Sequence, residues 1–135
     1  MSLEAFFKNR KIKFYWGAVF IWCALIYFLS DQPNLKTNLG VWDLILRKMA
    51  HMFEYAVLFL LSRRAFFNTV NKNFSIAFGV IFALLYAASD EYHQSFIVGR
   101  VGCVKDVLID CVGILLGLLC LYLYVRKNKF ENVNK

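Results

Sequence analysis

The sequence predicts an all-helical, polytopic membrane protein: one domain, residues 1–135, folded as a four-helix bundle of membrane spans with both termini in the cytoplasm. Composition is the first reason. Of the 135 residues 60% are hydrophobic and 18% aromatic, and only 19% are charged, whereas charged residues make up about a quarter of an average soluble domain. The second reason is that the apolar residues form long runs between short polar segments, which is the pattern of helices that cross a bilayer.

The first two spans are predicted at about residues 14–29 and 47–67. The first run is apolar throughout and stops before Pro33, which cannot donate a backbone hydrogen bond and restricts the residue before it. Residues 34–46 are predicted as a loop with a short amphipathic helix, which rests on the membrane interface through Trp42 and its apolar neighbours. The second span is polar in its first half and apolar in its second.

The third and fourth spans are predicted at about residues 74–90 and 104–125. A polar segment separates them and holds a predicted tight turn, Gly99-Arg100-Val101-Gly102. The fourth run has one acid inside it, Asp110, and basic residues follow it. A polar tail, predicted to be frayed, ends the chain.

The signs of the flanking charges predict the orientation. Of the 16 lysines and arginines, four lie in residues 8–13, three in the 62–73 loop and four after residue 125, which leaves five for the opposite side. An excess of lysine and arginine marks the cytoplasmic side of a membrane protein. We therefore predict a multi-pass membrane protein, with a polar outer half and an apolar inner half.

The net charge of +7 would also suit a nucleic-acid ligand. The basic residues, however, stand in short clusters between apolar runs, where a membrane protein needs them. We predict no nucleic-acid partner.

Polar residues recur on one face of the second span. Lys48, His51, Glu54 and Tyr55, preceded by Arg47, are spaced by three and four residues and so share one side of a helix. One interpretation is that the cations extend to the interface and Glu54 balances their charge. The other interpretation is a polar site inside the bundle. His51 and Glu54 lie too far along the span for their side chains to extend to the membrane interface.

The fourth span carries a stripe of two acids and two glycines. Asp106, Asp110, Gly113 and Gly117 follow the spacing i, i+4, i+7, i+11. The glycines predict close helix packing. That packing would bring both carboxylates into the bundle, where we expect them to pair with Arg100, Lys48 or His51, because an unpaired carboxylate in apolar surroundings is costly.

The end of the third span supplies the remaining members. Asp90, Glu91 and Gln94 share a face, and Arg100 offers a planar fork that holds a carboxylate or a phosphate. Either a structural ion pair or a ligand site would use it. The predicted polar binding cluster consists of Lys48, His51, Glu54, Tyr55, Asp90, Glu91, Gln94, Arg100, Asp106 and Asp110.

These motifs, in this order, resemble those of the VanZ-like family of bacterial membrane proteins. They are Lys48-x-x-His51-x-x-Glu54-Tyr55, Ser89-Asp90-Glu91-x-x-Gln94-x-Phe96-x-x-Gly99-Arg100 and Asp106-x-x-x-Asp110-x-x-Gly113, with Ser30-x-Gln32-Pro33 before them. The resemblance covers roughly residues 14–120. It implies a small multi-pass membrane protein, and the founding member is associated with resistance to the glycopeptide teicoplanin. It implies no settled enzymatic activity.

Four functions suit this pattern. The favoured one is non-enzymatic: binding of a lipid or lipid-linked envelope precursor by its head group, with an influence on glycopeptide susceptibility. A membrane enzyme would use His51 as acid/base, oriented by Glu54 or Asp90, or a metal held by His51, Glu54, Asp90 and Glu91. A proton- or ion-coupled transporter would need a homo-oligomer, and a purely structural cluster would only join the helices. We predict no cofactor, no bound metal and no catalytic residue.

Overall fold

A computed structural model describes residues 3–32, 40–70, 72–98 and 104–133, and in these segments the chain is helical with no strand. The all-α fold class is confirmed. The helices are α1 (Leu3–Ser30), α2 (Val41–Thr69), the short 3-10 helix η1 (Lys72–Phe74), α3 (Ser75–Gln94) and α4 (Val104–Val133).

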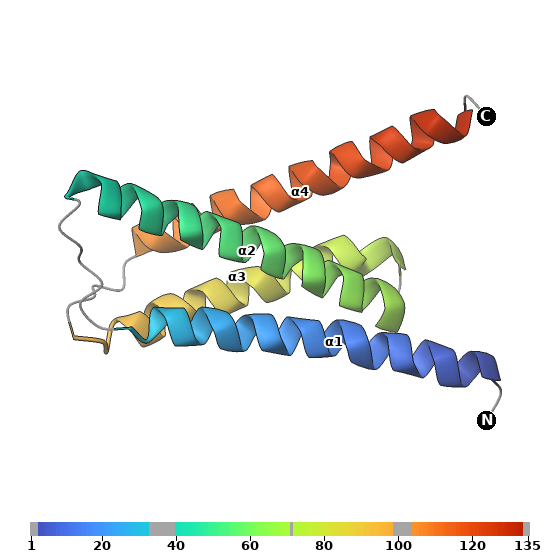
Figure 1. Cartoon of the computed structure of the whole chain (residues 1–135), viewed down its shortest axis with the longest axis horizontal. Helices are drawn as coiled ribbons and strands as arrows, with labels where there is room; N and C mark the ends of the chain where they lie inside the picture. The colour runs from blue at the N-terminus through green and yellow to red at the C-terminus, as the bar shows by residue number, and fades with distance from the viewer. Residues whose placement is uncertain (1–2, 33–39, 71, 99–103, 134–135) are drawn as a thin grey trace.

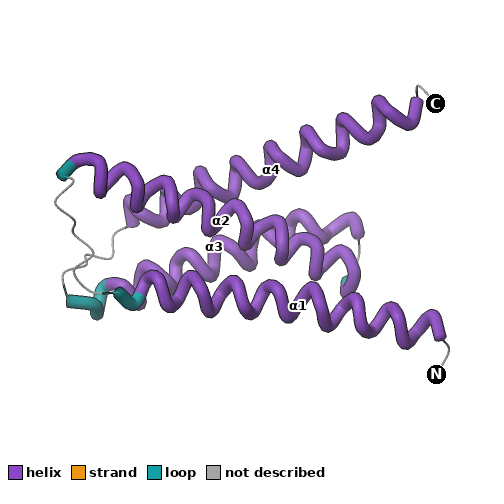
Figure 2. The backbone as a smooth tube through the Cα atoms, in the orientation of Figure 1, coloured by secondary structure: helices purple, strands orange, loops and turns teal. Residues whose placement is uncertain are grey.

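The four long helices form an open bundle. Helices α1, α2 and α3 run side by side, while α4 packs through its first half and then diverges from the others (Figure 1). Both ends of the chain lie at one end of the bundle, here called the terminal end. The end of α1 and the start of α2 lie at the opposite end, here called the polar end (Figure 2).

Among the described residues, three helical segments are long and apolar enough to cross a membrane: Asn9–Ser30, Lys72–Gln94 and Lys105–Asn132. Large apolar side chains stand exposed along them, such as Phe14, Ile21, Leu85 and Leu115. Exposed apolar surface on this scale is unfavourable in water and favourable against lipid. The protein is therefore a membrane protein.

Helix α2 is the central helix and contacts each of the other three. Its 29 residues include charged side chains near both ends, and it does not reach the apolar composition of its neighbours. Its middle is shielded by them, with buried Tyr55, Leu58, Phe59, Ser62 and Ala65. That α2 crosses the membrane stays a prediction.

The helices are longer than the apolar runs that predicted them. Helix α1 begins at Leu3 and not near residue 14, and α4 continues to Val133, where a frayed tail was expected. Lysine, arginine and glutamate have high helix propensity, so the basic flanks extend the apolar helices. The amphipathic segment around Trp42 is continuous with α2, which begins after Gly40 at φ 56°, a left-handed conformation that glycine adopts without strain.

Aromatic packing and two hydrogen bonds join α1 to its neighbours. The Trp16 ring meets Phe66 edge to face with centroids 5.1 Å apart, and Phe66 lies 5.5 Å from Phe78. Nearer the polar end, Trp22 Nε1 donates to the Glu54 carbonyl (2.9 Å) and the Tyr86 hydroxyl donates to the Cys23 carbonyl (2.7 Å). These contacts fix the axial position of α1 relative to α2 and α3.

Candidate functional site

The described members of the predicted polar cluster all lie in the part of the bundle nearest the polar end. They come from the first half of α2, the last turns of α3 and the first turns of α4, and α1 adds its own last turn. Arg100 is outside the described residues. The structure brings the other members except Tyr55 together in three groups and one pocket.

The first group is a buried hydrogen-bonded triad. Ser30 Oγ donates to Asp90 Oδ2 at 2.8 Å, and Gln94 Nε2 donates to the same oxygen at 2.8 Å and to Ser30 Oγ at 3.3 Å. All three side chains are buried. The triad therefore joins the end of α1 to α3 and gives Asp90 Oδ2 two donors.

The second group brings together one residue from each of three helices. His51 Nδ1 on α2 lies 3.4 Å from Asp110 Oδ1 on α4. Glu91 on α3 completes the group, with one ligand atom from each residue within 4.8 Å of the others. The carboxylate against His51 is thus Asp110, which is one of the pairings expected from sequence, whereas the enzyme alternative named Glu54 or Asp90 for this place. The metal variant of that alternative named His51, Glu54, Asp90 and Glu91. Of these, His51 and Glu91 lie in this group, while Asp90 accepts hydrogen bonds from Ser30 and Gln94.

The third group is a pair of ion pairs nearer the surface. Lys48 Nζ donates to Asp106 Oδ1 at 3.0 Å, and each of these two side chains is 39% exposed. Arg47 Nη2 contacts Asp43 Oδ2 at 2.7 Å, one turn away on the same helix. Both expected pairings of the α4 acids, with a lysine and with a histidine, are present.

Glycines allow α4 to come this close. A Cβ on Gly113 would lie 2.8 Å from Met52 Cα and closer still to the Met52 carbonyl oxygen, and one on Gly117 would lie 2.9 Å from the Ala56 oxygen. The predicted glycine stripe therefore faces the backbone of α2. Asp106 and Asp110 share this stripe and consequently face α2 as well.

A pocket opens between the end of α1 and the first half of α2. It has a volume of about 180 Å³ and is lined by Leu29, Ser30, Gln32, Arg47, Ala50, His51 and Glu54. His51 belongs both to this pocket and to the buried group with Asp110. Tyr55 lies deeper, fully buried, and its hydroxyl has no hydrogen-bond partner in the described part of the chain.

Sequence reasoning missed two contributors. Ser30 binds Asp90, and Asp43 binds Arg47. The signal for Ser30 was the Ser30-x-Gln32-Pro33 pattern, which stood out as a motif without a role. Asp43 had only its spacing of four residues from Arg47.

His93 forms a separate contact at the polar end. Its Nε2 lies 3.4 Å from Asp31 Oδ1, and its ring stacks on Tyr27 with centroids 4.6 Å apart. It links α3 to α1 and does not join the His51 group.

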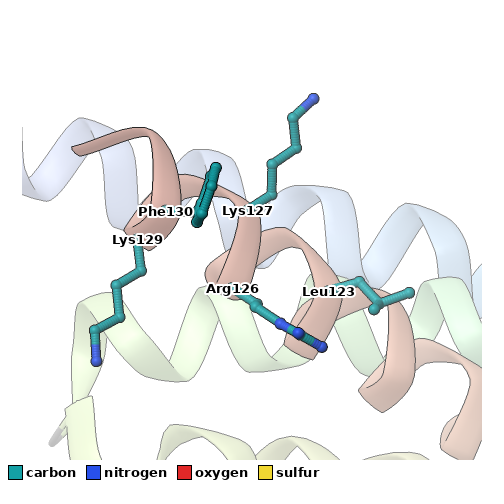
Figure 3. Close-up of a pocket in the computed structure, with 5 residues that line it drawn as sticks. All are labelled: Leu123, Arg126, Lys127, Lys129 and Phe130. Carbon is teal, nitrogen blue, oxygen red and sulfur yellow. The ribbon is translucent and has the colours of Figure 1, made fainter. Parts of the chain in front are cut away.

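A larger hollow of about 620 Å³ lies beside the diverging half of α4. Its lining residues, shown in Figure 3, are Leu123, Arg126, Lys127, Lys129 and Phe130. All come from one helix, and none belongs to the predicted cluster. This hollow offers cations and apolar groups but no carboxylate or histidine, so the candidate site is the polar cluster.

Apolar helices facing outward, with a buried polar cluster near one end, define a helical integral membrane protein. A sequence profile of the VanZ/LLP1 family matches residues 5–125. The chain belongs to this family, as its motifs indicated. Comparison with curated proteins and with solved structures gives no match.

Proposed function

We propose that this VanZ/LLP1 protein binds the head group of a membrane lipid or lipid-linked envelope precursor in the pocket between α1 and α2. The observation that carries the proposal is the lining of that pocket. It combines the Arg47 guanidinium, the His51 imidazole and the Glu54 carboxylate with the polar side chains of Ser30 and Gln32. A guanidinium recognises phosphate oxygens, and a carboxylate recognises an amine.

The size of the pocket favours a head group over a whole ligand. About 180 Å³ is below the roughly 300–1,000 Å³ of pockets that enclose drug-sized molecules. The lining also includes the exposed apolar residues Leu29 and Ala50. A lipid whose acyl chains stay in the bilayer would need to insert only its polar end.

The proposed setting is the bacterial cell membrane, with the polar end facing outward and both termini in the cytoplasm. Basic residues support it: Arg10, Lys11, Lys13, Arg126, Lys127 and Lys129 belong to the two helical segments that lead to the terminal end. Such residues favour the cytoplasmic face. An outward pocket would meet head groups of the outer leaflet.

Native mass spectrometry of the detergent-extracted protein tests head-group binding. We expect a phospholipid or polyprenyl-linked lipid to co-purify, and Arg47→Ala to reduce its occupancy about tenfold, a loss matched to one charge-assisted contact of about 1.4 kcal/mol. Arg64→Ala is the matched control, because Arg64 lies on the same helix and contacts Tyr15 instead. Equal lipid occupancy in Arg47→Ala and the native protein would refute the proposal.

Family membership extends the proposal to glycopeptide susceptibility. A protein that sequesters or presents envelope lipids changes what a glycopeptide meets at the cell surface. Expression in a susceptible Gram-positive host should raise the inhibitory concentration of teicoplanin, and Arg47→Ala should remove the increase while Arg64→Ala keeps it. An unchanged inhibitory concentration on expression of the native chain would exclude this consequence but not lipid binding.

A membrane enzyme is the second candidate function, and one observation favours it. Asp110 lies against His51 Nδ1 at 3.4 Å, where it would orient the ring so that Nε2 serves as acid/base at the pocket wall. Phosphate or head-group release from a panel of lipid-linked substrates, lost in His51→Gln, would support it. No product from any substrate would remove it.

A further inference from the structure

Three ligand atoms of the kinds that bind metals meet inside the bundle. They belong to His51, Glu91 and Asp110, which come from α2, α3 and α4 and place one atom each within 4.8 Å of the others. His51 is half-buried, and both carboxyl side chains are buried. Three separate helices thus converge on one point, which a rigid bundle holds in place without a flexible loop.

Asp110 provides an independent sign of a ligand. Its side chain is 0% exposed, and within the described part of the chain Oδ1 has only the 3.4 Å ion-pair contact with His51, while Oδ2 has no hydrogen-bond partner. His51 Nδ1, the atom that faces it, has no other partner there. Burial of a carboxylate is costly unless its oxygens are satisfied by donors or by a cation.

We propose that His51, Glu91 and Asp110 form a binding site for one divalent metal ion. An imidazole nitrogen suits first-row transition metals such as Zn²⁺, and two carboxylates suit Mn²⁺ and other hard cations. The mixed set therefore points to a divalent ion that accepts both nitrogen and oxygen, with Mn²⁺ and Zn²⁺ as the probes.

The spacing requires only a small contraction. Bonds from such ions to nitrogen and oxygen are about 2.0–2.2 Å long, so two ligand atoms on one ion stand at most about 4.4 Å apart. The three atoms lie within 4.8 Å of one another. Small side-chain rotations that move each atom by a few tenths of an ångström would bring them within the distance that one ion requires. Water or a bound head group would complete the coordination, because His51 also lines the pocket.

Such an ion would link α2, α3 and α4 at the level where the pocket ends. It would also neutralise the two carboxylates behind the pocket wall and so remove their repulsion of an anionic head group. Metal binding itself does not depend on head-group binding, and the two have separate measurements.

The full chain, purified in detergent and stripped with chelator, is titrated with Zn²⁺ and, separately, Mn²⁺. We expect one bound ion per chain by elemental analysis after desalting, a Mn²⁺ electron paramagnetic resonance signal that differs from that of the free ion, and a higher unfolding temperature with metal, since ligands that bind only the folded state stabilise it.

Conservative variants identify the ligands. His51→Gln, Glu91→Gln and Asp110→Asn should each weaken metal binding by more than about tenfold, because even residues behind the ligands commonly contribute that much. His93→Gln and Asp31→Asn are the matched controls and should bind like the native chain. His93 is the other histidine, and Asp31 is the carboxylate that contacts it, away from the His51 group.

Two results would overturn the site. One is a native chain that binds no more metal than Asp110→Asn and shows no shift in unfolding temperature. His51 and Asp110 would then form only an ion pair, in which the imidazole is protonated. The other is equal loss of metal in the control variants, which would indicate non-specific binding. If one ligand variant fails to accumulate, the other two and the metal-dependent unfolding temperature of the native chain still decide.

Discussion

At the scale of single residues, partner choice divides the polar cluster into groups with different roles. Asp90 Oδ2 accepts hydrogen bonds from two neutral donors, Ser30 and Gln94. Asp106 shares its ion pair with solvent, whereas Asp110 is fully buried against His51. Four residues along the same helix are enough to change a carboxylate from solvated to enclosed.

The triad around Asp90 predicts that loss of a single hydroxyl group lowers the stability of the protein measurably. Ser30→Ala removes a buried donor to a carboxylate and should lower the free energy of unfolding by about 1.5–3 kcal/mol, the range for hydrogen bonds to charged groups. Ser89→Ala is the control, because Ser89 is exposed and donates only within its own helix. Its effect should stay within about 0.5 kcal/mol. Denaturant unfolding in detergent measures both, and equal effects would contradict the triad.

The Lys48–Asp106 pair predicts a weak coupling. Both side chains are 39% exposed, and exposed ion pairs contribute about 0.2–1 kcal/mol in double-mutant cycles. A cycle of Lys48→Met and Asp106→Asn should therefore give a coupling near about 0.5 kcal/mol that falls as salt is raised. A coupling energy above about 2 kcal/mol that does not change with salt concentration would mean that the pair is shielded from solvent.

At the scale of elements, α2 organises the bundle because its two ends and its middle are chemically different. Its middle buries apolar side chains against three neighbours, and its first half turns charged groups toward α4. The turn of α4 that follows Asp110 presents glycine to the α2 backbone. Close approach at Gly113 therefore positions the Asp110 carboxylate one turn before it and the Asp106 carboxylate two turns before it.

Gly113 should tolerate no side chain. In Gly113→Ala the new methyl group would meet the Met52 backbone, which cannot move as a side chain can. Overpacking of this kind costs about 1–3 kcal/mol, and the displaced α4 should also lose the His51–Asp110 contact. Gly17→Ala is the control, since nothing lies within 4 Å of its Cβ position, and helix propensity should stabilise that variant by up to about 1 kcal/mol. Thermal unfolding of both variants provides the comparison, and a Gly113→Ala protein as stable as the native chain would contradict the packing.

At the scale of the whole molecule, both termini lie at one end of the bundle (Figure 1). Within the part of the chain that the structure describes, three helices satisfy the composition of a membrane span, and α2 does not. An odd number of crossings would separate the termini across the membrane, whereas four crossings keep them together. With α2 as a fourth crossing, both termini would lie on the same side of the membrane, which agrees with their position at one end of the bundle.

Reporter fusions test this topology. Alkaline phosphatase should be active when fused after residues 35 and 101 and inactive when fused after residue 71 or at the C-terminus, because basic flanks stay in the cytoplasm. Green fluorescent protein at the same positions should give the reverse pattern. Equal phosphatase activity after residues 35 and 71 would show that α2 does not cross.

Much of this protein could be predicted from sequence because helices are local structures. The apolar runs predicted four helices, and spacings of three and four residues correctly grouped Asp90 with Gln94 and Asp106 with Asp110 and Gly113. Helix ends were predicted less well, since charged flanks such as those of α1 and α4 remain helical. Helical periodicity shows which residues share a face of a helix. It does not show which neighbouring helix that face contacts.

Only the tertiary structure decided which face meets which. Asp110 rather than Glu54 lies against His51, Ser30 reaches Asp90 across the bundle, and Glu91 joins the His51 group. These pairings depend on the rotation and axial register of whole helices, which follow from the glycine contact between α4 and α2 and the hydrogen bonds that hold α1. One helical sequence is compatible with many rotations, and the sum of packing against three neighbours selects one of them.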